Sequence, residues 1–283
     1  MKHIIDDIYK MFSDEMPEVT DEWADHLGEQ IAKMLKDRLQ EQRNEYKLRL
    51  SSLGSGNRKL WYSVREGIPK EPLLPATRIK FLFGDIIELM YIALVRLSGH
   101  EVTHEQEEVH LNGIKGHIDC LVDGGLVDVK SAASFSFKKF SEDKLHESDA
   151  FGYYSQLAAY AEAGGFIPAG WLVMDKQLGH LCFAQAKPQF LPDMDARSKE
   201  VIEIVKQETE PEPCAPPAPD GKSGNMKLAT VCSYCAFKQH CWRESNGGHG
   251  LRAFLYSTGP RFLTNVTKLP NVPEVTKEFK NDS

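Results

Sequence analysis

Two short stretches in the middle of the chain carry charged side chains at spacings that suit chemistry. Asp128 and Lys130 are two residues apart in the run LVDVKS, so on a β-strand both point to one face of the sheet. Asp119 lies in the preceding run GHIDC, and a hairpin between the runs would bring it near them. Two carboxylates and an ammonium on one face are costly unless a divalent cation lies between the acids. Hard oxygen ligands of this kind suit Mg²⁺ or Mn²⁺.

Other interpretations of these residues stay open at this point. An Asp-x-Lys pair is also found on exposed hairpins that carry ordinary surface charges. Glu88 lies inside the apolar stretch 86–95 and either faces solvent or is a third metal ligand. Gln156 and Tyr160 are four apart in a helical pattern and share one face, where they are either site residues or a surface amide and a core aromatic.

The elements that must position these residues follow from hydrophobic periodicity and turn residues. Helices are expected over residues 3–12, from Thr20 to Tyr46, and over 79–97, 148–163 and 194–207. Strands are expected over 101–111, 114–122, 126–131, 169–175 and 179–187, with the second and third joined as a hairpin across 123–125. Residues 207–220 contain five prolines and form a linker or an ordered loop. The order predicts an α/β sandwich with a mixed sheet.

Composition narrows the class of protein. The chain has 283 residues, of which 41% are hydrophobic and 27% charged, which predicts a sizeable folded core. Its longest apolar stretch, 86–95, is interrupted by Glu88 and is too short to span a bilayer. Six cysteines without a secretory pattern indicate a reducing compartment. We therefore expect a cytoplasmic protein, without a membrane partner, whose thiols bind metals more readily than they form disulfides.

Taken together, the charged motifs resemble the PD-(D/E)XK nuclease superfamily, in particular its RecB-like exonuclease branch. That family has a helical acid, an Asp on one strand, a D/E-x-K on the next strand and a Q-x-x-x-Y helix. The same order is present here as Gly84-Asp-Ile-Ile-Glu88, Asp119, Asp128-Val-Lys130 and Gln156-Leu-Ala-Ala-Tyr160. Ile118 replaces the proline of the family motif. The resemblance covers roughly residues 51–245. Within the branch, the chain is similar to phage-encoded and CRISPR-associated exonucleases.

The resemblance implies a fold, a domain organisation and a function. The fold is a restriction-endonuclease-like core with a mixed central sheet flanked by helices. The expected domains are a helical N-terminal segment (1–50), the nuclease core (51–210), a Pro-rich linker (211–226) and a Cys-containing C-terminal region that packs on the core (227–283). The expected activity is metal-dependent hydrolysis of phosphodiester bonds at single-stranded or duplex DNA ends, in recombination, repair or replication. A structure- or sequence-selective endonuclease and a non-catalytic DNA-binding module are the alternatives.

Roles for individual residues come with the resemblance. Glu88, Asp119 and Asp128 would hold one or two Mg²⁺ or Mn²⁺ ions, with the carbonyl of Val129 as a further ligand. Lys130 would act on the attacking water, while Gln156 and Tyr160 would orient the site or the phosphate. The candidate DNA contacts are Arg58, Lys59, Trp61, Tyr62, His117, Lys138 and Lys139. For Trp61 and Tyr62 the alternative is a core position at a helix start, and for His117 it is a structural histidine.

A second resemblance concerns the cysteines near the C-terminus. Cys232-x-x-Cys235-x5-Cys241 is similar to the trio that binds a 4Fe–4S cluster in RecB-like nucleases, whose fourth cysteine lies far upstream. In this chain Gly56 stands at that upstream place. Cys214 could supply the missing ligand, His240 or His249 could complete a Cys3His zinc site, or the trio could bind no metal.

Charge is unevenly distributed along the chain. The net charge is −7, and residues 1–30 contain nine acidic and two basic residues. This acidic segment either borders the DNA channel and competes with substrate, or is a solvated helical appendage. Basic clusters at 51–70 and 226–243 suit phosphates, although a solvated basic face is the more common explanation of such a cluster. The sequence leaves the oligomeric state undetermined.

Overall fold

The structure, a computed structural model, describes residues 3–14, 16–40, 47–72 and 75–279. The chain forms two compact units, each of which combines segments that are far apart in the sequence. The first unit contains Met1–Glu45, Arg49–Gly54 and Leu74–Lys199, and the second contains Tyr46–Leu48, Ser55–Leu73 and Glu200–Ser283. Segment 55–73, expected within the nuclease core, thus belongs to the same unit as the cysteine-containing region.

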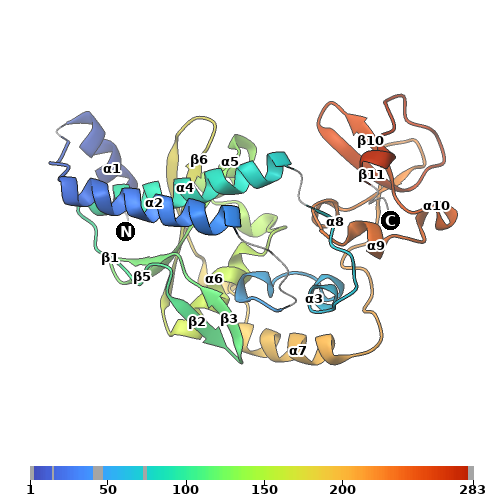
Figure 1. The fold of residues 1–283 in the computed structure, drawn as a ribbon, viewed down its shortest axis with the longest axis horizontal. Helices are drawn as coiled ribbons and strands as arrows, with labels where there is room; N and C mark the ends of the chain where they lie inside the picture. Colours follow the sequence, from blue (N-terminus) through green and yellow to red (C-terminus); the bar gives the residue numbers. More distant parts are fainter. Residues whose placement is uncertain (1–2, 15, 41–46, 73–74, 280–283) are drawn as a thin grey trace. The chain divides into compact units, whose positions relative to one another are not determined.

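The first unit is built on a five-stranded mixed sheet (Figure 1). Its strand order is β1 (Val102–Thr103), β4 (Cys120–Val122), β5 (Gly125–Ala132), β6 (Ile167–Asp175) and β7 (Leu181–Gln185). Strands β5 and β6 pair in parallel, and the other neighbours pair antiparallel. Strands β2 (Glu108–Leu111) and β3 (Ile114–His117) form a separate hairpin. The expected α/β class with a mixed central sheet is confirmed.

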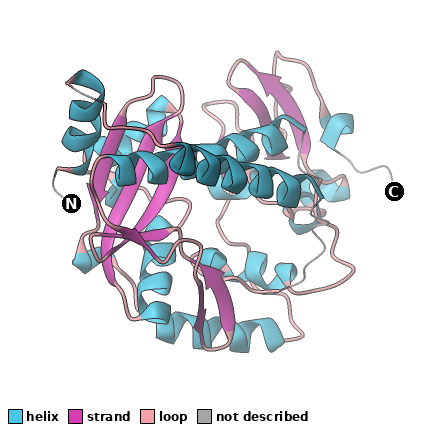
Figure 2. Cartoon of the chain, turned by 60° about the vertical axis from the view of Figure 1, so that its left-hand side comes forward, coloured by secondary structure: helices cyan, strands magenta, loops and turns pink. Residues whose placement is uncertain are grey.

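Helices pack against both faces of this sheet. Helices α1 (Ile4–Ser13) and α4 (Pro75–Leu97) share one apolar core with alternate residues of the strands, among them Leu172. The neighbouring Trp171 therefore points to the opposite face, where it contacts α5 (Ser134–Ser141) and α6 (Tyr153–Gly164) through Phe140 and Tyr154. Helix α2 (Asp21–Gln40) runs beside α4 (Figures 1 and 2), and Arg38 Nε lies 2.8 Å from Asp85 Oδ2.

Helix α1 is part of the core. Ile4, Ile8 and Met11 recur at helical spacing and are buried against α4 and β7. Neither expectation for the acidic segment anticipated this packing, because its acidic residues masked a narrow apolar stripe. The prediction of a short helix over residues 3–12 is confirmed, whereas the idea that it is a solvated appendage is wrong. In the following helix, Thr20 Oγ1 accepts the Trp23 N–H as the expected cap, and Tyr46 lies outside the described residues.

Two long strands expected from the sequence are broken in the structure. The strand predicted over 101–111 is interrupted by a turn in which His104 and Gln106 have positive φ, at 56° and 54°. The strand predicted over 114–122 is interrupted at residues 118–119, where Ile118 N–H donates to Glu107 O and Asp119 O accepts from Gln106 N–H. These breaks send β2 and β3 out of the main sheet. The predicted hairpin between β4 and β5 is confirmed, with Val122 opposite Gly125.

Helix α6 begins five residues later than the sequence suggested. Gly152 adopts a left-handed conformation with φ of 73°, which a helix cannot continue through. The carboxylate of Asp149 accepts the backbone N–H groups of Tyr153 and Tyr154, both at 2.9 Å, and thereby caps the new start. The left-handed Gly165 ends the helix, as expected.

The second unit contains a small antiparallel sheet and several short helices. The strand order is β10 (Arg252–Tyr256), β11 (Gly259–Asn265), β9 (Met226–Lys227) and β8 (Ala218–Pro219). Its helices are α3 (Asn57–Ser63), α8 (Thr230–Ser233), α9 (Lys238–Cys241) and α10 (Ser245–Gly248). The division between the two units, after Lys199, falls within helix α7 (Met194–Lys206). The 3₁₀ turns of the described residues are η1 (Leu50–Ser52), η2 (Leu145–Glu147), η3 (Pro188–Phe190) and η4 (Thr276–Phe279). Within the described residues, no helix is long and apolar enough to cross a bilayer.

Candidate active site

Strand β5 places Asp128 and Lys130 on the same face of the sheet. Val127 and Val129 alternate with them and point into the core shared with α1 and α4, as the two-residue period of a strand requires. Asp128 is only 1% exposed. Lys130 Nζ lies 2.8 Å from Asp128 Oδ1 and 2.7 Å from Oδ2, so the ammonium bridges both carboxylate oxygens. Asp128 is therefore buried and Lys130, whose side chain is 21% exposed, is half-buried, unlike an ordinary pair of surface charges.

The amide of Gln156 fixes the same carboxylate from helix α6. Its Nε2 donates to Asp128 Oδ1 at 2.9 Å and lies 3.4 Å from the hydroxyl of Tyr160, one turn further along the helix. The expected common face of Gln156 and Tyr160 is confirmed. A glycine at position 116 makes room for the tyrosine, because a Cβ there would lie 2.7 Å from Tyr160 Cε1 and 2.9 Å from Leu50 Cβ.

Asp119 and Glu88 complete a group that we call the acid cluster: Glu88, Asp119, Asp128 and Lys130. Asp119 lies between β3 and β4, and its Oδ2 accepts the Val129 N–H at 2.6 Å. Glu88 comes from the middle of α4, and its Oε1 accepts Gln106 Nε2 at 2.6 Å. Sequence reasoning missed Gln106, because its contact depends on the turn that breaks the predicted strand and no spacing announces it.

The pKa values of the three acids in the acid cluster are raised, because the carboxylates are removed from water and two of them lie near other acids. The pKa of Asp119 is raised to about 7, mainly by burial and next by the nearby Asp128, against the opposing effect of Lys130. Burial, followed by Asp119, raises the pKa of Glu88 well above its ordinary value. Burial also raises the pKa of Asp128, with Lys130 opposing. Burial alone would lower the pKa of Lys130, but Asp128 and Asp119 outweigh it and the net shift is upward. The cluster thus lacks positive charge.

The donor set suits a hard divalent cation. All three acids offer oxygen ligands, and Asp128 Oδ2 is buried with the Lys130 ammonium as its polar contact. As they stand, no three His, Cys, Asp or Glu side chains among the described residues are placed to hold a metal ion. The carbonyl of Val129 as a ligand stays a prediction.

The DNA contacts predicted at 58–62 lie in the second unit and are largely engaged within it. Trp61 and Tyr62 are 8% and 1% exposed and pack with Phe237. Trp61 Nε1 donates to Gln207 O at 2.8 Å, and the Tyr62 hydroxyl bonds to Glu210. Their packing agrees with the alternative of core aromatics, and rings buried in this way are not open to stack on bases. Lys59 Nζ donates to Ser55 Oγ at 3.1 Å.

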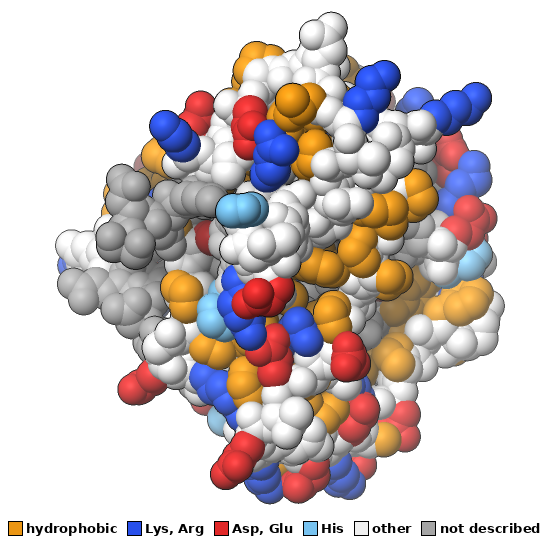
Figure 3. Space-filling model, turned by 90° about the vertical axis from the view of Figure 1, so that its right-hand side faces the viewer, with side chains coloured by type: hydrophobic (Ala, Val, Ile, Leu, Met, Phe, Trp, Pro, Cys, Tyr) orange, Lys and Arg blue, Asp and Glu red, His pale blue; other side chains and the backbone are white. Residues whose placement is uncertain are grey.

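Basic residues of the second unit have acidic partners from distant segments. Arg58 Nη1 lies 3.0 Å from Glu210 Oε1, and Arg243 Nη2 lies 3.4 Å from Glu210 Oε2. Lys238 forms an ion pair with Glu71. On the face drawn in Figure 3, Lys and Arg side chains lie next to Asp and Glu side chains. The positive charge of the basic clusters seen in the sequence is therefore partly offset by acidic residues that folding brings next to them.

The remaining predicted DNA contacts lie in the first unit. His117 lies on β3 with its side chain about half exposed and Nε2 3.5 Å from Glu108 Oε2, and the partial burial of its ring lowers its pKa. Lys138 and Lys139 follow the Lys130 strand on α5, where Lys138 is exposed and Lys139 Nζ lies 3.2 Å from Ser148 Oγ. Their role in DNA binding stays a prediction.

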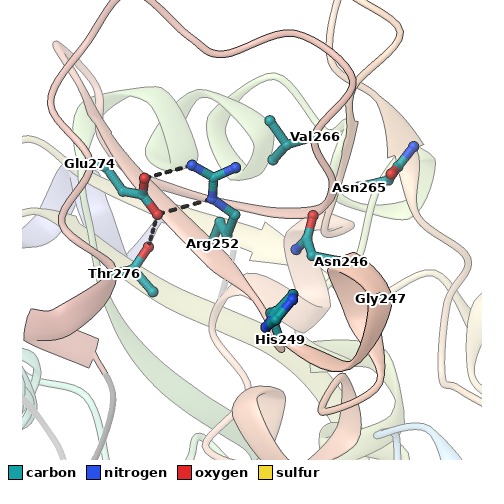
Figure 4. A pocket seen from close by; sticks show the side chains of 8 residues that line it. All are labelled: Asn246, Gly247, His249, Arg252, Asn265, Val266, Glu274 and Thr276. Carbon is teal, nitrogen blue, oxygen red and sulfur yellow. Dashed lines mark hydrogen bonds and ion pairs between the residues drawn. The ribbon is translucent and has the colours of Figure 1, made fainter.

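A cavity of about 450 Å³ lies in the second unit, among the loops around β10 and β11 (Figure 4). Its wall carries the ion pair between Arg252 and Glu274, with Nη2 and Oε2 2.6 Å apart, and Thr276 also donates to Glu274. His249 lines this cavity. His249, which the sequence suggested as a possible zinc ligand beside the cysteines, therefore lies with the side chains of this cavity.

Comparisons with known proteins give little beyond this geometry. No protein-family model matches the chain, and no curated protein matches it in sequence. Among solved structures, the chain is similar to the alkaline exonuclease LHK-Exo of Laribacter hongkongensis. The two are 14% identical with a TM-score of 0.35, and the match covers 66% of this chain and 93% of that one.

Proposed function

We propose that the chain is a divalent-metal-dependent deoxyribonuclease that hydrolyses phosphodiester bonds at DNA ends. The observation that supports this proposal is the acid cluster, in which three carboxylates from α4, the β3–β4 junction and β5 meet one lysine. A structural ion pair needs one acid for one lysine, and each further buried carboxylate costs stability. Groups with strongly shifted pKa values of this kind are typical of functional sites.

Each residue of the cluster has a chemical task in this proposal. Glu88, Asp119 and Asp128 would hold one or two Mg²⁺ or Mn²⁺ ions. A bound ion of this type polarises phosphoryl oxygens and lowers the pKa of its water. Lys130 keeps a positive charge beside Asp128, where it can orient the attacking water or offset the growing negative charge on the phosphate.

The residues of helix α6 would maintain this arrangement. The Gln156 amide donates to Asp128 Oδ1 and so fixes the direction in which the carboxylate presents its second oxygen. Tyr160, held next to Gln156, would in turn fix the amide or contact the phosphate. The order of these residues along the chain is that of the RecB-like exonucleases which the sequence resembles, and this resemblance favours DNA ends as the substrate. A role in recombination, repair or replication would follow.

Digestion of end-labelled DNA tests the proposal. Linear, nicked and closed circular DNA are incubated with Mg²⁺, Mn²⁺ or EDTA. We expect nucleotides to be released from linear DNA with either metal and not with EDTA, while closed circles stay intact. Cleavage of closed circles would instead identify an endonuclease. If no DNA is cut with either metal by a folded protein, the proposal is wrong.

Single substitutions then connect the activity to the acid cluster. Asp119→Ala, Asp128→Ala and Lys130→Ala should each lower the rate by about a hundredfold or more, the usual order for such groups. DNA binding should largely survive, because phosphate contacts elsewhere would carry it. A matched control is Lys144→Ala, which removes a lysine whose surface ion pair with Glu142 has both side chains at least half exposed. Near-normal cleavage by the Lys130 variant would refute the site.

A further inference from the structure

Four thiols of the second unit come from two separate segments. Cys232 lies in α8, Cys235 between α8 and α9, and Cys241 at the end of α9, while Cys214 belongs to the proline-rich segment. All six cysteines of the chain lie in described residues and are free thiols. Cys232, Cys235 and Cys241 each lie within electrostatic reach of Cys214. We call Cys214, Cys232, Cys235 and Cys241 the thiol cluster.

The side chain of Cys214 occupies the space that a side chain at position 56 would need. A Cβ on Gly56 would lie 2.5 Å from both Cβ and Sγ of Cys214, closer than real Cβ atoms approach their neighbours. The backbone of Gly56 has φ −67° and ψ 152°, a conformation open to any residue. Glycine is therefore required here by the position of Cys214 and not by the backbone.

Burial raises the pKa of Cys232, Cys235 and Cys241, which favours the neutral thiols while no metal is bound, but N–H donors and cations lie at the sulfurs. Cys235 Sγ lies 3.5 Å from the backbone nitrogen of Phe237, which donates to it, and Arg58 Nη1 donates to Cys241 Sγ at 3.6 Å. The backbone N–H of Ala215 donates to Cys232, which ties the Cys214 segment to the trio. Burial outweighs the other effects on the pKa of Cys235, and the Phe237 N–H and the Lys59 ammonium act against it in favour of the thiolate. N–H donors and cations at sulfur are the outer partners that thiolate ligands of metals need.

We propose that Cys214, Cys232, Cys235 and Cys241 bind one thiophilic metal centre, and that Cys214 supplies the ligand which position 56 cannot. Four thiolates around Zn²⁺, or around a 4Fe–4S core of charge +2, leave a charge of about −2, which Arg58 and Lys59 would offset. Each thiol releases its proton when it binds. The sulfurs must also close in on the metal, because as they stand no described group of three such side chains could hold one.

The alternative ligands are less well placed. The ring of His240 packs edge-on against Tyr62, with the ring centroids 5.2 Å apart, and His249 lines the cavity of Figure 4. Cys214, by contrast, contributes to the electrostatic environment of every member of the trio. The proposal is independent of the nuclease function, since it rests on the second unit alone.

Metal analysis of the full chain, purified without oxygen, tests the proposal. We expect about one zinc, or about four irons with matching sulfide and broad visible absorption, per chain. Cys214→Ser should lose most of this metal, whereas Cys182→Ser, a control in β7 of the first unit, should keep it. A wild-type protein that contains neither metal after reconstitution, or a Cys214→Ser variant with undiminished metal and spectrum, would overturn the proposal.

A transplant of the thiol gives a test that does not depend on loss alone. The double variant Gly56→Cys with Cys214→Gly should regain the metal, because its new side chain enters the space that Cys214 left. The matched double variant Gly56→Ala with Cys214→Gly differs in a single sulfur atom and should stay depleted. Circular dichroism checks that both are folded. Equal metal content in the two double variants would contradict the assignment of this ligand position.

Discussion

Replacing Asp119 by asparagine should stabilise the metal-free protein and at the same time abolish its activity. Asp119→Asn keeps an oxygen that can accept the Val129 N–H, which Asp119 Oδ2 now accepts at 2.6 Å, but removes the charge. The wild-type carboxyl has a pKa raised from 3.8 to about 7, mainly by burial. Its charged form is therefore the costly one, and the substitution removes that cost.

The magnitude and its pH dependence follow from this shift. Between pH 4 and pH 7 the folded protein keeps a proton on Asp119 that the unfolded chain has released, so stability falls as the pH rises through this window. A difference of about 3 pKa units corresponds to about 4 kcal/mol at most. Because Lys130 remains and the neighbouring acids readjust, we expect about half of that, roughly 2 kcal/mol, as the gain at pH 8.

Denaturant unfolding at pH 5 and pH 8, in EDTA and in Mg²⁺, measures this effect. Without metal, the wild type should be less stable at pH 8 than at pH 5, and Asp119→Asn should reduce the difference. Mg²⁺ should stabilise the wild type at pH 8 more than the variant, since a ligand stabilises the state that binds it. Asp37→Asn, on the exposed side of α2, is the matched control. Equal stability of wild type and Asp119→Asn at pH 8 without metal would refute the idea of an overcharged site.

Three further predictions concern residues outside the acid cluster. Gln156→Ala removes a donor to the buried Asp128 and should cost roughly tenfold in rate, about 1–2 kcal/mol, in a single-turnover assay; an unchanged rate would contradict its positioning role. Gln106→Leu, which removes the Nε2–Glu88 contact at 2.6 Å, should weaken activation by Mn²⁺, visible as a higher metal concentration for half-maximal rate. Deleting residues 1–13 removes Ile4, Ile8 and Met11 from the core; at about 1.5–3 kcal/mol per side chain the first unit should unfold, which a cooperative thermal melt of the truncated chain would disprove.

The charged motifs could be found in the sequence because each depends on local geometry. A strand with alternating Val and charged residues fixes the common face of Asp128 and Lys130, and a helical spacing of four does the same for Gln156 and Tyr160. Both were confirmed by contacts at 2.7–3.4 Å. Burial of Asp128 did not follow from these spacings, since an exposed hairpin carries the same pattern.

Features that depend on contacts between distant segments were not visible in the sequence. The Gln106–Glu88 contact requires a turn with positive φ at a non-glycine residue, which no turn motif indicated. The core role of α1 requires a partner surface on α4 and β7, and the acidic residues beside its apolar stripe pointed toward solvent. A core position for Trp61 was an alternative from the sequence, but its hydrogen bond to Gln207 O depends on a segment almost 150 residues away and was not foreseen.

The two units differ in how far their charged side chains are paired with opposite charges, and this difference would affect DNA binding. In the second unit, Arg58 and Arg243 share Glu210, so their two positive charges are partly offset within the fold. In the acid cluster three carboxylates meet one lysine, which leaves a charge of about −2 when all are ionised. A phosphate would be repelled from such a site, so under the proposed function the phosphate at the reacting position should bind more weakly in EDTA than in Mg²⁺. Phosphate contacts far from the acid cluster should not depend on the metal. A short DNA makes few such contacts, so its binding affinity should fall more on removal of Mg²⁺ than the affinity for long DNA does.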